Sequence, residues 1–268
     1  MTLTTRNTVL FFGLVVIILL FLSYCFSLFF IFYREFSFPF NLKLFSLFGL
    51  GKDLVINFFL TLFIGIFSLC GWFVIRSSFS KTRSPEIFFF TFFLVSLSFE
   101  MIRVIHYYFF VREIPLIFGI LFTRIVFFGR FFGLLCIFFS GLFSSWLNLQ
   151  RVGIALSILI LFCFTLAYAV PVNADIRPDF LYSTGIESEL FIIRIFLSAF
   201  AVLNFLFAAI LKRNPDYIYL SIYTAAIVLG RELVSFFFSP QAVIAGCGLL
   251  LFGSLFFGRK LHSIYLWI

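Results

Sequence analysis

Charged residues are scarce in this chain of 268 residues: Lys, Arg, Asp and Glu together make up only 11% of it. Soluble globular proteins carry about 25% charged residues. A chain of this size folded in water would therefore lack the polar surface needed to cover itself. Disorder is excluded as well, because it requires low hydrophobicity together with high net charge. The composition thus excludes both a water-soluble enzyme and a disordered protein.

Cysteine and histidine are also few, and their spacing does not indicate a disulfide framework, a metal site or a catalytic site. The five cysteines stand singly in apolar runs without a CxxC pair, which supports neither a disulfide framework nor a thiolate metal site. His106 and His262 fall on opposite sides of the topology derived below, so they cannot share a metal or a haem. HExxH and GxSxG motifs are absent. We expect no metal and no cofactor, and the sequence leans against an enzyme. The one catalytic alternative is His106 acting with a nearby glutamate as an acid–base pair.

Long apolar runs dominate the chain, which is 63% hydrophobic and unusually rich in phenylalanine, with 49 residues of that type. A membrane-spanning helix needs about 20 apolar residues, and the runs lack the alternation of a membrane β-barrel. We therefore expect an all-α, polytopic integral membrane bundle that forms a single domain over residues 1–268. The expected spans are approximately 9–32, 54–75, 87–110, 124–147, 152–170, 190–211, 217–238 and 242–258.

The region Pro115–Leu147 is too long for one straight span and contains two arginines. We expect Pro115–Thr123 to be a short re-entrant or interfacial piece before the fourth span, with a single tilted helix as the alternative. The stretch Pro171–Glu189 is expected to be an ordinary polar loop between spans five and six.

Lysines and arginines near the span ends predict the orientation of the helices. Nine of them fall on the side of the N-terminus and five on the other side. The nine are Arg6, Arg76, Lys81, Arg83, Arg151, Lys212, Arg213, Arg259 and Lys260. Because cytoplasmic loops are enriched in these residues, we expect both termini in the cytoplasm of a cell-membrane protein. The net charge of +8 then needs no nucleic-acid partner. Trp72, Trp146 and Trp267 fall near the inner boundaries, as an interfacial aromatic belt would place them.

All charged side chains inside the expected spans fall in the half of the bilayer away from the termini. Charges within a bilayer are costly and mark functional sites by default. Glu100 and Arg103 are three residues apart, so on a helix they share a face and are expected to pair. Arg124 and Arg194 lie at span ends, where long side chains reach the headgroups. The candidate ligand-binding residues are Glu100, Arg103, His106, Arg130, Arg231 and Glu232.

These in-span charges are unbalanced, because five arginines face two glutamates and three positive charges remain. Arginine stays protonated in proteins, so it cannot escape by losing its proton. Its planar fork suits a carboxylate or a phosphate. Two interpretations stay open: a pocket for an anionic or amphipathic ligand, and a structural ion network whose surplus arginines reach the headgroups.

Small residues form a stripe on the fourth span. Gly129 and Gly133, extended by Ser140, lie on one helix face and predict close packing against a neighbouring helix. Ordinary packing within the bundle is the simplest interpretation of this stripe.

The best prediction of function is a ligand-sensing membrane module. Its partners would be the lipid bilayer, an anionic or amphipathic ligand, and a separate protein that carries an output or catalytic domain, because no stretch of this sequence is typical of one. A transporter or flippase component for an anion or a lipid-linked substrate is the first alternative. A structural subunit of a membrane assembly is the second, and fold class alone does not choose among the three.

Overall fold

The computed structural model describes residues 3–37, 51–79, 84–145, 152–236 and 239–266, and these form a bundle of long helices with one small hairpin. The elements are α1 (Leu3–Ser37), α3 (Gly51–Phe79), α4 (Pro85–Leu97), the 3-10 turn η1 (Ser98–Met101), α5 (Ile102–Val111), α6 (Leu116–Ser145), α7 (Val152–Ala169), β1 (Val172–Ile176), β2 (Tyr182–Thr184), α8 (Glu187–Lys212), α9 (Asp216–Phe236) and α10 (Pro240–Leu266). Eight segments in the described residues are long and apolar enough to cross a membrane, the number expected from the sequence.

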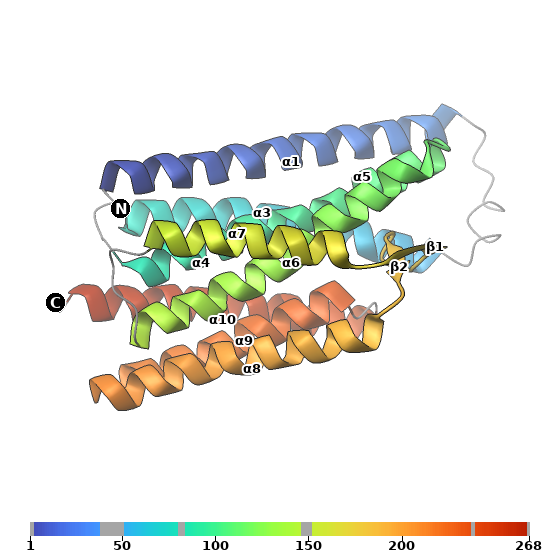
Figure 1. The fold of residues 1–268 in the computed structure, drawn as a ribbon. Coiled ribbons are helices and arrows are strands. Elements are labelled where there is room, and N and C mark those ends of the chain that lie inside the picture. Colours follow the sequence, from blue (N-terminus) through green and yellow to red (C-terminus); the bar gives the residue numbers. More distant parts are fainter. Residues whose placement is uncertain (1–2, 38–50, 80–83, 146–151, 237–238, 267–268) are drawn as a thin grey trace.

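The helices run side by side, and the two ends of the bundle differ (Figure 1). α1 begins and α10 ends at one end, which we call the terminal end; the β1–β2 hairpin lies at the other, the hairpin end. The expected polar loop after the fifth span is in fact this antiparallel hairpin, in which Val172 lies opposite Thr184 and Ile176 opposite Tyr182, with an irregularity between the two pairs.

Two expected boundaries are wrong. α6 is one continuous helix from Leu116 to Ser145, so Pro115–Thr123 is not a separate re-entrant piece, and the long-helix alternative is correct. Arg124 lies within this helix, and its guanidinium stacks on the ring of Tyr168, 4.7 Å from the ring centre. α10 continues well past the expected end of the last span, where Lys260 pairs with Asp216 at 2.6 Å. The expected ends of spans four and seven, Leu147 and Phe238, lie outside the described residues.

The third span, Pro85–Val111, occupies the centre of the bundle. Its most apolar window is 94% buried, against 17% for the first span, and it contacts α1, α3 and α6. Aromatic rings fill this core: Phe89 stacks on Phe143, with ring centres 5.2 Å apart. The outer helices expose large apolar side chains such as Phe59, at 69%. Exposed apolar surface of this extent is unusual on a soluble monomer, and it fits a lipid environment.

Glycines set the closest helix contacts. A Cβ atom added at Gly129 would lie 2.5 Å from the Cβ atom of Phe99, and one added at Gly133 would overlap the hydroxyl of Ser96. α6 therefore meets the third span along the stripe of small residues. Further along this stripe, the Ser140 hydroxyl donates to a backbone carbonyl of α4 at 3.2 Å.

Replacing Gly129 by alanine is expected to destabilise the bundle by about 1–3 kcal/mol, the usual cost of an extra methyl group in a tight interface. Gly153→Ala on α7 is the matched control, because nothing lies within 4 Å of the added Cβ atom there. Unfolding of both variants in mixed detergent micelles measures the difference. Equal stability of the two variants would contradict the close contact between α6 and the third span.

Candidate functional site

Glu100 lies in η1, the 3-10 turn that interrupts the third span between α4 and α5. Two serines precede or begin this turn: Ser96 donates its hydroxyl to the carbonyl of Phe93 and Ser98 donates to Val95, both at 2.6 Å. Such bonds offer the helix carbonyls a second partner and bend helices. A 3-10 stretch within a long helix often marks a functional or strained position. The local sequence therefore places a carboxylate at a break in the most buried span.

Arg130 of α6 binds this carboxylate with two nitrogen atoms. Its Nε donates to Glu100 Oε1 at 2.8 Å and its Nη2 donates to Oε2 at 3.0 Å. This two-point geometry is the strong form of an arginine–carboxylate pair. The contacts of Gly129 and Gly133 with the third span bring the two backbones close enough for the pair to form.

Arg103 connects the same carboxylate to the hairpin. Its Nη1 donates to Glu100 Oε2 at 3.3 Å, as expected for this pair, and its Nε donates to the backbone carbonyl of Asp179 at 3.0 Å. Nη2 donates to the side-chain oxygen of Asn57 in α3, and the Asn57 amide donates to the carbonyl of Pro178 at 2.8 Å. The fully buried Asp179 adds its carboxylate, 3.5 Å from Arg130 Nη2.

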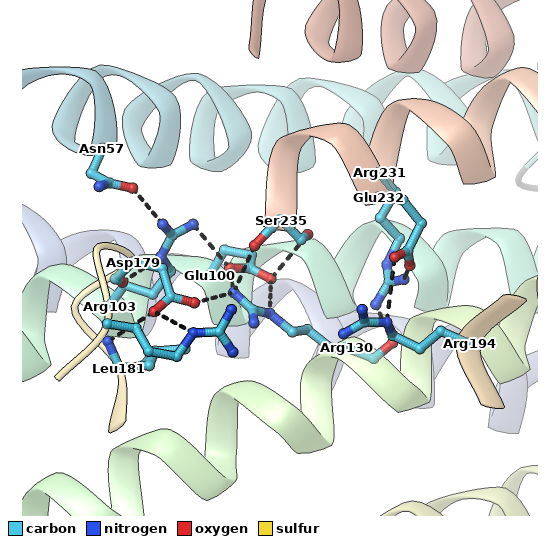
Figure 2. A network of polar contacts seen from close by, with 11 residues as sticks. Asn57, Glu100, Arg103, Arg130, Asp179, Leu181, Arg194, Arg231, Glu232 and Ser235 are labelled. Atoms are coloured by element: carbon cyan, nitrogen blue, oxygen red, sulfur yellow. Dashed lines mark hydrogen bonds and ion pairs between the residues drawn. The ribbon is translucent and has the colours of Figure 1, made fainter. Parts of the chain in front are cut away.

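α9 closes the other side of the network, as Figure 2 shows. Ser235 donates its hydroxyl to Glu100 Oε1 at 3.3 Å. Arg231 donates to the backbone carbonyl of Arg130, and its Nη1 pairs with Glu232 at 2.9 Å. The second oxygen of Glu232 lies 3.4 Å from Arg194 Nε of α8.

The candidate residues from the sequence thus fall into one connected group with one exception. Glu100, Arg103, Arg130, Arg231 and Glu232 are joined by the contacts above. His106 is buried and meets the ring of Tyr182 edge-on, with ring centres 4.9 Å apart. In the described part of the chain no hydrogen bond or ion pair joins His106 to Glu100 or Arg103.

Arg194 corrects a second expectation, because it does not extend to the headgroups. Its side chain is 10% exposed and pairs with Glu232. Its guanidinium carbon lies 3.3 Å from the centre of the Phe236 ring, and that of Arg130 lies 4.6 Å from the same centre. The carboxylate and the aromatic ring account for the inward position of this side chain.

Asp179 and Asn57 belong to the network but were not found from the sequence. Asp179 stands in a polar loop with other acids, and no local pattern predicts that this loop folds back onto the helices. Asn57 did carry a signal, since it is an amide near the start of an otherwise apolar span. An uncharged amide can nevertheless accept a hydrogen bond from a buried arginine.

Glu86 shows that in-span charge is not confined to the hairpin half. α4 begins at Pro85, because the hydroxyl of Ser84 caps the helix by accepting a hydrogen bond from the amide of Ile87, and this start brings Glu86 into the third span. The side chain is buried at the terminal end and accepts hydrogen bonds from Ser84 at 2.6 Å, Ser144 at 3.2 Å and Tyr265 at 2.7 Å.

The network at the hairpin end retains one positive charge. Its four buried arginines face three carboxylates; the members are Arg103, Arg130, Arg194, Arg231, Glu100, Asp179 and Glu232. The partly exposed Arg177 lies 4.0 Å from Asp179 and balances its own charge with Glu187. Asp179 thus supplies part of the missing negative charge. Arg130 Nη1 is buried without a hydrogen-bond partner among the described residues. Chemically the arrangement offers anion recognition. Within the described ranges, no group of three or more His, Cys, Asp and Glu side chains is placed to hold a metal.

In comparisons with protein-family models, curated proteins and solved structures, no match to this chain is found.

Replacing Glu100 by glutamine is expected to lower the free energy of unfolding by about 3–5 kcal/mol, because it leaves two buried arginines without their shared charge. Glu187→Gln is the control: Glu187 pairs with Arg177 but is 49% exposed, and such pairs contribute about 0–1 kcal/mol. Reversible unfolding in detergent micelles compares the two variants. A loss at Glu100 no larger than at Glu187 would contradict the central role of this carboxylate.

Replacing Asp179 by asparagine is expected to loosen the hairpin while keeping its shape. Amide hydrogens of Val172–Thr184 should exchange about tenfold faster, because weakening a buried charged contact costs about 1–3 kcal/mol. Hydrogen exchange followed by mass spectrometry measures this effect. The control is Asp175→Asn, an exposed residue of the same hairpin; equal exchange in both variants would contradict the docking through Asp179.

Proposed function

We propose that this chain is a membrane-embedded binding module for an amphipathic ligand that carries a carboxylate or a phosphate. The observation that carries the proposal is the surplus of arginine at one side of the network. Arg130, Arg194 and Arg231 converge there around Glu232 and the ring of Phe236. An unpartnered guanidinium nitrogen of Arg130 adds a donor that an anionic oxygen would satisfy.

The proposed entry lies between α8 and α9. Glu232 is 19% exposed at its side chain, more than the other carboxylates of the network. On α8, the ring centre of Phe191 lies 5.8 Å from the guanidinium carbon of Arg194, and this residue is 48% exposed. An anionic headgroup that reaches Arg194 would leave its acyl chain along this apolar face. This arrangement supports an amphipathic ligand over a small hydrophilic anion.

The module is proposed to lie in a cell membrane with its terminal end on the cytoplasmic side. The excess of lysine and arginine at the terminal end favours a cytoplasmic location for that end, so the network faces the opposite side of a cell membrane. If the module acts as a ligand sensor, a second protein that contacts the terminal end must carry the output or catalytic domain.

A structural role is the second candidate, and a specific observation favours it. The oxygens of Glu100 accept hydrogen bonds from two arginines and one serine, so most of the network is satisfied from within. On this alternative, the network holds the hairpin and helices together in a subunit of a membrane assembly. The two candidates differ in whether an added anion binds.

Arg194→Gln is the decisive variant, because Arg194 is the most exposed arginine of the group. The purified protein is titrated with dodecyl phosphate, and binding is followed by native mass spectrometry. We expect binding to the wild type and a loss of affinity of about tenfold in the variant, the effect of one hydrogen bond to a charged group.

The matched control is Arg124→Gln, which removes the same charge from an arginine that stacks on Tyr168 outside the network. Its affinity should equal that of the wild type. If the wild type does not bind dodecyl phosphate, or if both variants bind it equally, the binding proposal is wrong and the structural role stands.

A further inference from the structure

A small cavity lies at the terminal end, far from the arginine network. It is formed where α1 begins, α3 ends and α4 begins, and its polar lining comes from Arg6, Asn7, Trp72, Arg76 and Thr91. The cavity measures about 20 Å³, room for one water-sized group. The cavity thus lies among three helix ends at the terminal end of the bundle.

Trp72 lines this cavity and has an unpartnered hydrogen-bond donor. The side chain is 2% exposed and packs with Ile17 and Val95, so it does not face the lipid as an interfacial belt residue would. Its indole Nε1 has no hydrogen-bond partner among the described residues. Indole nitrogen donates only, and a buried donor that stays unpaired is costly. The other two tryptophans, Trp146 and Trp267, lie outside the described residues.

The charged lining of the cavity is entirely positive among the residues described. Arg6 and Arg76 both line it. Arg6 Nη2 donates to the side-chain oxygen of Asn7 at 3.5 Å, and the guanidinium carbon of Arg76 lies 5.5 Å from the centre of the Trp72 ring. The acidic residue of α4 is Glu86, which directly precedes the lining residue Ile87. Its carboxylate already accepts hydrogen bonds from the hydroxyls of Ser84, Ser144 and Tyr265. The cavity thus combines two guanidinium groups with a buried neutral donor.

We propose that this cavity binds a phosphate group, with one phosphate oxygen accepting the Trp72 indole hydrogen and the two arginines holding the remaining oxygens. The enclosed volume accommodates one phosphate oxygen, and the guanidinium groups of the two arginines can bind the other oxygens at the edge of the cavity. The phosphate comes either from the headgroup of an anionic lipid or from free phosphate. Anionic lipid is abundant in cytoplasmic leaflets. The excess of lysine and arginine predicts that the terminal end of the bundle faces such a leaflet. The competing occupant is a single water molecule.

Two arms of one experiment distinguish the sources. In the first, the full chain in detergent is titrated with inorganic phosphate; in the second, it is placed in nanodiscs with increasing phosphatidylglycerol in phosphatidylcholine. Thermal unfolding reports binding as a rise in the midpoint temperature. We expect a rise in at least one arm, and the arm that responds identifies the source.

Trp72→Phe keeps an aromatic ring but removes the indole donor together with the pyrrole part of the ring, and Arg76→Gln removes one charge. Each is expected to weaken phosphate binding by about tenfold, the effect of one hydrogen bond to a charged group. Arg259→Gln is the control, an exposed arginine at the terminal end that does not line the cavity. Arg124→Gln, which removes an arginine of α6 that belongs to neither site, should also bind as the wild type does.

Absence of a rise in both arms would overturn the proposal and leave water as the occupant. Binding by Trp72→Phe and Arg76→Gln that equals that of Arg259→Gln would overturn it as well. If Trp72→Phe does not fold, Arg76→Gln alone decides, because Arg76 is only partly buried and its replacement leaves the core unchanged.

Discussion

The carboxylate of Glu100 is the interaction on which the rest of the structure depends. It lies in a buried 3-10 turn and accepts hydrogen bonds from Arg103, Arg130 and Ser235. A charge that is buried away from water is tolerated only when it is paired with good geometry. Satisfying this one group therefore determines how α6, α9 and the third span sit against each other, and Arg103 extends the constraint to the hairpin through Asp179.

Close backbone packing and buried charge support each other in this bundle. Gly129 and Gly133 let α6 approach the third span, and Arg130 lies between them in the sequence. Without the glycines the guanidinium would stand too far from Glu100, and without the ion pair the close approach would bury an unpaired charge. In lipid, where apolar side chains gain little from leaving the solvent, such contacts and hydrogen bonds specify which helices meet.

The two ends of the bundle use polar groups differently. At the hairpin end, arginines and carboxylates form a nearly balanced network that retains one positive charge. At the terminal end, Glu86 is satisfied by hydroxyl groups alone among the described residues, while Arg6 and Arg76 line a separate cavity beside Trp72. Between the ends the core is largely aromatic. This separation is what makes both proposed sites testable by single substitutions that leave the opposite end unchanged.

The amino-acid sequence by itself determined the helical class, the eight apolar segments and the pairing of Glu100 with Arg103, because apolar run length and helical spacing are local properties of the chain. It did not determine that Arg124 leaves α6 continuous, that Arg194 turns inward to Glu232, or that Asp179 completes the network. Those features depend on partners distant in the sequence: Arg103 and Asp179 are 76 residues apart. Only the tertiary structure decided them, because a buried charge takes the partner that packing brings within reach.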